Sequence, residues 1–455
     1  MTAIASQTAR SLQQIAPNIV ARVKDGDLQK AQLGTLGVGA ILIAVAWLTA
    51  HEPKDFYFSY LVGYMGVLGI ALCALFFTMV QHITRAGWSV SVRRLAENTA
   101  ATLPFLLLLF APIVIGFGDL FHHWNHANVD ANGAPLAETD PHFDAVLAGK
   151  AGWLNTQFFF VRVGIYFAIW IALALYFRSQ SVKQDETGDP AISLRLSRLA
   201  APGILLFALS ITFAAFDWIM SLDPHWFSTI FGVTYFAGGF MAFFAFTILL
   251  AKWLGKQGYL KDAITTEHYH DLGKFLFTFV VFWTYTNFSQ YMLIWYANLP
   301  EETRWFVDRE QGGWGAVGTI LVVAHFLIPF AFLLSRHVKR SALGLPIGAI
   351  FLLVIHCIDM QFLILPTKGG HGPAHGVPEH AQHPSEQLAS GIEYGLSRFP
   401  HDLGVYLHNI GWADFGCFVG LLAIVTGLVL MNVRKSNLLP VRDPRLAESL
   451  HFQNL

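Results

Sequence analysis

The sequence predicts an all-α polytopic membrane protein with ten transmembrane helices, and three observations support this fold class. Hydrophobic residues make up 54% of the 455 residues and charged residues only 13%, whereas charged residues are about 25% of an ordinary soluble domain. Ten mainly apolar stretches each approach the roughly 20 residues that a helix needs to cross the hydrocarbon. The basic residues between these stretches alternate strongly between two sides.

The ten predicted spans follow one another through most of the chain. Most connections between them are short, so consecutive helices are expected to lie antiparallel. Prolines inside the spans predict kinks or irregular turns, because proline removes a backbone hydrogen-bond donor; these are Pro104, Pro112, Pro202, Pro329 and Pro346. The spans are 33–50, 58–80, 99–121, 155–177, 199–221, 228–251, 272–296, 313–335, 341–365 and 407–431.

The basic residues predict the orientation of the chain. With connections assigned alternately to two sides, the side holding both termini carries 21 Lys and Arg residues and the other side 6, while Arg162 and Lys274 lie inside spans. Lys and Arg are enriched in cytoplasmic loops, so both termini are expected in the cytoplasm. The expected layout is a cytoplasmic tail (1–32), a ten-helix membrane domain (33–431) with long outer loops at 122–154 and 366–406, and a second cytoplasmic tail (432–455).

Motifs for bound redox cofactors are missing from the sequence. The three cysteines, Cys73, Cys357 and Cys417, are isolated within spans, and there is no CxxCH, no cysteine cluster and no GxGxxG or phosphate loop. We therefore expect no cofactor, catalytic residue or metal site in this chain. The histidine-rich run at 371–383 leaves three possibilities open: a hydrated loop, which we favour, a metal chelator or a proton buffer. Its histidines are His371, His375, His380 and His383.

Polar and ionisable side chains within the spans gather in the predicted outer half. Such residues are costly in a bilayer and usually mark a pathway or a buried pair. Arg162 and Asp414 each lie seven residues from the outer end of a span, roughly 10 Å deep at 1.5 Å per residue. The inner half has fewer such groups, with Glu97 just before span three and Asp271 and Lys274 at the start of span seven. The candidates for a proton pathway are Asp119, Arg162, Asp217, His325, His356, Asp359 and Asp414.

Several interpretations of these residues remain open. Carboxylates and imidazoles leading from the outer face to mid-membrane suit a proton half-channel, with His325 near the midplane as a relay. In this interpretation Arg162 adjusts the pKa values of the carboxylates. Arg162 could instead pair with one aspartate and tie helices together. His325 and His356 could ligate a b-type haem. Tyr285 and Gln290, with His356 and Asp359, offer a weak quinone site.

Two stretches carry a resemblance to a known family. The first is Phe213-Ala-Ala-Phe-Asp-Trp-Ile-Met-Ser-Leu-Asp-Pro-His-Trp-Phe-Ser-Thr-Ile-Phe-Gly-Val, and the second runs from Asp271-Leu-Gly-Lys-Phe-Leu-Phe through Phe282-Trp-Thr-Tyr-Thr-Asn-Phe-Ser-Gln-Tyr-Met-Leu-Ile-Trp-Tyr-Ala-Asn-Leu-Pro-Glu-Glu-Thr303. Together they resemble the ActF-type, NrfD-like membrane subunit of bacterial alternative complex III, a quinol:cytochrome c oxidoreductase. This subunit is also labelled quinone-binding subunit 2.

The resemblance implies two four-helix bundles with two flanking helices, in a multi-pass protein of the bacterial cytoplasmic membrane. It also implies a second NrfD-like membrane subunit, an iron–sulfur subunit and c-type cytochrome subunits as partners, with iron–sulfur clusters and c-type haems in those partners and quinol in the complex. We expect this chain to scaffold the electron-transport complex and to provide the proton half-channel. The alternatives are a quinone-binding subunit, a stand-alone secondary transporter or a b-haem protein.

Overall fold

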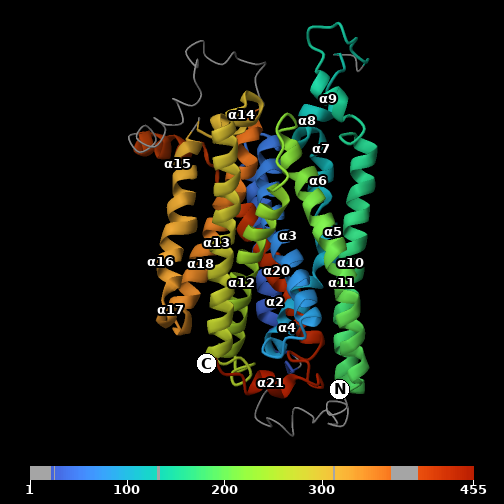
Figure 1. Cartoon of the computed structure of the whole chain (residues 1–455), viewed down its shortest axis with the longest axis vertical. Helices are drawn as coiled ribbons and strands as arrows, with labels where there is room; N and C mark the ends of the chain where they lie inside the picture. Colours follow the sequence, from blue (N-terminus) through green and yellow to red (C-terminus); the bar gives the residue numbers. More distant parts are fainter. Residues whose placement is uncertain (1–21, 25, 131–133, 311–312, 370–397, 455) are drawn as a thin grey trace.

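The computed structural model describes residues 22–24, 26–130, 134–310, 313–369 and 398–454 (Figure 1). Within these ranges the regular structure is helical, and the only β-type pairing is one isolated bridge between Val129 and Pro135. Nine helices or helix runs of the described part are long and apolar enough to cross a membrane. The prediction of an all-α polytopic membrane protein is therefore confirmed, and the histidine-rich run 371–383 lies outside the described residues.

The helices follow the predicted spans closely. One predicted span, 272–296, lies in a helix of 32 residues, α13, that is not among the nine. Its many Tyr, Thr, Asn and Gln residues lower its hydropathy. The helices are α2 (Gln29–Thr49), α3 (Pro53–Ile83), α4 (Val90–Ala100), α5 (Leu103–Leu108), α6 (Ala111–Ile115), α7 (Phe117–Leu120), α8 (His122–Asn125), α9 (Ala145–Lys150), α10 (Thr156–Thr187), α11 (Pro190–Trp218), η1 (Met220–Leu222), α12 (Phe231–Lys256), α13 (Thr266–Ala297), α14 (Pro300–Asp308), α15 (Trp314–Ile320), η2 (Leu321–Leu327), α16 (Ile328–Leu334), α17 (Arg336–Arg340), α18 (Gly344–Ile364), η3 (Leu365–Gly369), α20 (Trp412–Lys435) and α21 (Leu446–Leu450).

Helix α3 is the central element of the fold. It is apolar on all sides, as expected for a helix surrounded by other helices, and 25 of its 31 residues are buried. One group of neighbours, α4 to α7, α10 and α11, packs against it on one side, while α12, α13, the α15–η2–α16 run and α18 form a second group that meets it through α12 and α18. Helices α2 and α20 pack on each other, and α20 also packs along α3.

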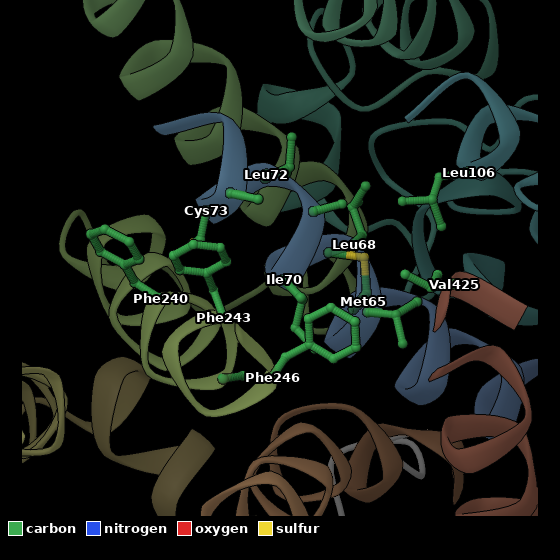
Figure 2. Packing of buried hydrophobic residues seen from close by; sticks show 14 of the residues in the cluster. Met65, Leu68, Ile70, Leu72, Cys73, Leu106, Phe240, Phe243, Phe246 and Val425 are labelled. Carbon is green, nitrogen blue, oxygen red and sulfur yellow. The ribbon is translucent and has the colours of Figure 1, made fainter. Parts of the chain in front are cut away.

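Close helix contacts hold this centre together. Figure 2 shows Met65, Leu68 and Cys73 of α3 packed among phenylalanines of α12 and Val425 of α20. At Gly63 of α3, an added Cβ would lie 2.7 Å from the main chain of Cys417 in α20. Only a glycine allows these two backbones to approach so closely, which is a common basis of packing between membrane helices.

Two predicted spans are interrupted at prolines, as the sequence indicates. Span three consists of the short helices α4 to α7, and Pro104 and Pro112 lie at the starts of α5 and α6. Span eight changes from α-helix to the π-helical turn η2, and α16 resumes with Pro329 near its start. Each proline lacks the N–H that would continue the preceding helix.

The two ends of the bundle differ in character (Figure 1). We call the end that carries residues 122–154, α14 and η3 the loop end, and the end that carries α17 and α21 the terminus end. Span ten differs from its expected start. Residues 398–409 form a separate helix and α20 begins only at Trp412. Asp414 therefore lies in the first turn of α20, near the loop end, instead of seven residues inside a span.

Candidate functional site

One of the predicted intramembrane aspartates forms a complete ion pair with the buried arginine. Arg162 of α10 donates from Nε to Asp217 Oδ2 at 2.7 Å and from Nη2 to Oδ1 at 2.9 Å. Tyr166 and Trp153 donate to the same carboxylate at 2.8 and 2.9 Å. A bidentate arginine fork with two further donors satisfies the charge of Asp217 on α11.

The arginine side of this pair is equally enclosed. Arg162 Nη1 donates to the main-chain oxygen of Trp153 at 2.9 Å, and its guanidinium lies over the rings of Trp153 and Phe158 at 4.3 and 4.4 Å. Both partners are almost fully buried. We call the Arg162–Asp217 ion pair, together with its donors Tyr166 and Trp153, the closed pair. It joins α10, α11 and the loop that precedes α10, as the structural alternative for Arg162 anticipated.

A second carboxylate has very different surroundings. Asp359 of α18 is 3% exposed and accepts one hydrogen bond, from Trp283 Nε1 of α13 at 3.1 Å. Within the described part of the chain, no Lys or Arg nitrogen forms an ion pair with it. His325 of η2 stacks on Trp283, with ring centroids 3.6 Å apart and planes at 18°. The tryptophan therefore contacts both a carboxylate and an imidazole.

Gly238 of α12 completes this group from the opposite side. An added Cβ there would lie 3.3 Å from Asp359 Oδ2, 3.4 Å from Trp283 Cδ1 and 3.6 Å from His356 Nδ1. We call Trp283, His325, His356 and Asp359, with Gly238, the open cluster. Four helical segments thus bring together three residues that the sequence proposed for a proton pathway. The i, i+3 spacing of His356 and Asp359 correctly predicted that they share a face.

The two histidines of the open cluster are fully buried, and their ring nitrogens have few protein partners. Within the described part of the chain, none of the four ring nitrogens of His325 and His356 has a hydrogen bond of good geometry, although the Gly66 main chain approaches His356. Buried polar groups are nearly always satisfied by protein or by ordered water, so each exception needs an explanation. Neutral imidazole offers one donor and one acceptor nitrogen. The open cluster can therefore accommodate water or a polar ligand between its members.

The backbone that positions His325 is itself unusual. His325 lies in the seven-residue π-helical turn η2, four residues before Pro329 of α16. Short π-helical turns occur frequently at functional sites, and the missing N–H of Pro329 loosens the helix at this point. The sequence signalled this irregularity only through the proline.

Asp414 belongs to a third set of contacts, near the loop end. It accepts from Ser59 Oγ at 2.5 Å and from the Gly411 main-chain N–H at 2.8 Å, so it caps the start of α20. Its own main-chain oxygen accepts from Gln361 Nε2 at 3.3 Å, and Tyr406 donates to Gln361 Oε1 at 2.7 Å. Gln361 lies two residues after Asp359 on α18. These contacts lead from the loop end to the helix that carries the open cluster.

The other predicted site residues lie apart from these groups. Asp119 is exposed on the short helix α7. Tyr285 is 63% exposed on α13, whereas Gln290 is buried on the same helix and accepts a hydrogen bond from Ser228 at 3.0 Å. The structure does not bring Tyr285 and Gln290 together as a quinone site. Among the described residues no group of three or more His, Cys, Asp or Glu side chains is arranged to hold a metal ion.

The terminus end holds more buried charge than the sequence suggested. Arg93 of α4 binds Glu97 at 3.1 Å and Asp443 at 2.6 Å, and Arg94 binds Glu97 at 2.9 Å and Asp185 at 2.9 Å. The expectation that this half of the bundle carries few titratable groups is wrong. Glu97 was placed just before span three, but α4 carries it into the packed bundle, where the C-terminal segment covers it.

Sequence reasoning missed Trp283 and Gly238 of the open cluster. Trp283 lies near the middle of α13, far from the interface where indole rings usually lie, and that position was the available signal. Gly238 belongs to a run of small residues in α12 and gave no specific signal. The comparisons with known proteins add no assignment, because neither a family model nor a curated protein matches this chain.

Proposed function

We propose that this protein is a membrane subunit that relays protons between mid-membrane and the loop end through the open cluster. The observation that carries the proposal is that, among the described residues, Asp359 has no basic ion-pair partner and lies beside the weakly hydrogen-bonded imidazoles of His325 and His356. Imidazole changes its protonation near neutral pH more readily than other side chains. Carboxylates and histidines facing a bundle interior are the usual components of proton relays in membranes.

The residues take distinct roles in this proposal. Asp359 accepts and releases the proton, Trp283 orients its carboxylate through the 3.1 Å hydrogen bond, and His325 and His356 exchange protons with it through water. Asp414, with Ser59 and Gln361, provides the connection toward the loop end. Arg162 and Asp217 contribute rigidity instead of conduction, because their hydrogen bonds are already complete. Asp119 is a candidate only for the exposed mouth.

The sequence resemblance supplies the proposed biological setting. We place the chain as an ActF-type, NrfD-like subunit of a quinol:cytochrome c oxidoreductase in the bacterial cytoplasmic membrane, with both termini in the cytoplasm. The two helix groups around α3 and the pair α2 and α20 are compatible with two four-helix bundles and two flanking helices. The proposed partners are a second NrfD-like subunit, an iron–sulfur subunit and c-type cytochromes, which carry the redox centres.

The test uses the assembled complex with Asp359→Asn. Asparagine retains the size of the side chain and can still accept from Trp283, but it does not release a proton. We expect lower quinol turnover and a lower ratio of protons released to electrons transferred, measured with a pH indicator in sealed vesicles. The matched control is Asp262→Asn, which removes an exposed carboxylate from the turn between α12 and α13. Wild-type turnover and proton release in the Asp359→Asn complex would contradict the proposal.

A b-type haem held by His325 and His356 is the second candidate, because the same imidazole nitrogens could ligate iron. Packing favours the relay. Trp283 contacts His325, and Gly238 lies against both Trp283 and His356, so protein atoms already connect the two histidines. A Soret band in the purified chain that disappears in the His325→Ala variant would favour the haem instead.

A further inference from the structure

Arg309, at the end of α14, is a deeply buried cation of the loop end. It is 3% exposed and stacks on Trp305 with its guanidinium carbon 3.5 Å from the ring. The sequence places few basic residues on this side of the protein, and Arg309 was not among the predicted site residues. Burial lowers the pKa of Arg309 to about 9, although Asp223 and Asp308 oppose this shift. The guanidinium therefore remains charged at neutral pH.

Two of the three hydrogen bonds of Arg309 end on main-chain oxygens of another helix. Nε donates to Phe362 O at 3.0 Å and Nη2 to Leu363 O at 3.0 Å, while Nη1 donates to Trp305 O at 3.1 Å. Phe362 and Leu363 belong to the last turn of α18. A cation at a helix C-terminus also interacts favourably with the helix dipole.

The last four carbonyl groups of a helix have no partner within that helix, and at α18 all four are accounted for. Gln361 O accepts from the Leu365 N–H and Ile364 O from the Thr367 hydroxyl at 2.7 Å. Arg309 satisfies the remaining two. The end of α18 is therefore held to α14 by a rigid, planar fork, which a lysine would not reproduce.

This attachment lies one helical turn from the open cluster. Asp359 is three residues before Phe362, and His356 is three residues earlier again. Trp305, on which Arg309 stacks, in turn stacks on Trp226 at 4.6 Å and 16°. Through Trp305, the end of α18 is therefore connected to the turn that follows α11, the helix that carries Asp217.

We propose that Arg309 is a positioning residue that fixes the outer turn of α18 and thereby the placement of Asp359 and His356. This inference rests on the proposed relay function. Arg309 touches neither side chain, so its role is exerted through the α18 backbone.

The test compares Arg309→Lys and Arg309→Gln with Arg304→Gln in the assembled complex. Arg304 lies on the same helix, but its side chain is 49% exposed and its distance to Asp308 is a long 3.9 Å. Two readouts are needed: hydrogen–deuterium exchange of residues 356–369, and the pH profile of quinol turnover. We expect several-fold faster exchange, a several-fold loss of turnover and a displaced pH profile in Arg309→Gln, with partial rescue in Arg309→Lys and none of these effects in Arg304→Gln.

The outcomes separate the two proposals. Unchanged exchange in both Arg309 variants overturns the attachment itself. Faster exchange with wild-type turnover and an unmoved pH profile shows a structural cap only and overturns the positioning role. If Asp359→Asn leaves turnover intact, the relay function fails, and the exchange measurement still decides whether Arg309 holds α18. Should Arg309→Gln not assemble, Arg309→Lys still tests the fork, because it retains the charge but not the two parallel hydrogen bonds.

Discussion

The closed pair and the open cluster place two buried aspartates in opposite situations. Asp217 receives four hydrogen bonds, two of them from an arginine fork. Within the described residues Asp359 receives one, from an indole, and the imidazoles beside it have no well-formed hydrogen bond. A fully satisfied buried ion pair is costly to alter and holds one charge state. A carboxylate beside unsatisfied imidazoles can change protonation at lower cost, because no fixed cation opposes the change.

The difference shows that two equally buried carboxylates can have very different hydrogen-bond surroundings. From the sequence, the intramembrane aspartates were equivalent candidates for a proton pathway. Their hydrogen-bond partners in the structure distinguish them. The two groups are connected through the fold, because α11, which carries Asp217, packs on α12, which carries Gly238.

The largest expected effect comes from breaking the closed pair with Arg162→Met. The change leaves Asp217 buried beside Tyr166 and Trp153 without its cation, and removing one partner of a buried pair typically costs about 3 to 5 kcal/mol. We expect loss of assembled protein or a large decrease in the unfolding temperature, measured by intrinsic fluorescence. The double variant Arg162→Met/Asp217→Leu should recover most of the stability. If the single and double variants are equally unstable, the charge of Asp217 is not what Arg162 stabilises.

A smaller and more specific effect is expected for Gly238→Ala in the open cluster. The new methyl group would approach Asp359 and Trp283 at 3.3 and 3.4 Å, so the side chains must shift by a few tenths of an ångström. Overpacking of this kind costs about 1 to 3 kcal/mol. We expect assembled complex with lower turnover, measured as quinol oxidation per complex. The control is Gly118→Ala on α7, where an added Cβ meets nothing within 4 Å. Equal turnover in both variants would argue against a tightly fitted cluster.

Much of the fold was predictable because the length and apolar character of a span are properties of a single segment. Prolines correctly marked the breaks in spans three and eight. The candidate site was predictable only in part: His356 and Asp359 share a helix face by their spacing, but Trp283 and Gly238 come from distant segments. Their contacts depend on how α12, α13 and α18 pack, which no local pattern encodes. Asp414 was misplaced in depth because the Gly411 break does not interrupt the apolar pattern.

The smallest expected effect concerns the loop that covers the closed pair. Trp153 reaches Asp217 from the end of this loop. Two contacts attach the loop to the 222–227 turn. Lys150 donates to Pro224 O at 2.6 Å, and the Asp144 carboxylate lies 2.6 Å from His225 Nε2. Burial raises the pKa of Asp144, but hydrogen bonds from the Leu147 and Val146 amides and from His225 outweigh this, and the net pKa is lowered.

A lowered pKa in the folded state means that ionised Asp144 stabilises the loop at neutral pH and that this stabilisation is lost as the pH falls through its folded-state pKa. Because both side chains are partly exposed, solvent screening limits the contribution to about 1 kcal/mol or less. In Asp144→Asn we expect faster hydrogen exchange of residues 144–154 at neutral pH, and a difference from wild type that shrinks on acidification. Exchange at the open cluster should stay unchanged, because Asp144 acts only on the loop that closes over Arg162 and Asp217. A difference that persists after the Asp144 carboxylate has been protonated at low pH would show that the ionised carboxylate is not the stabilising form.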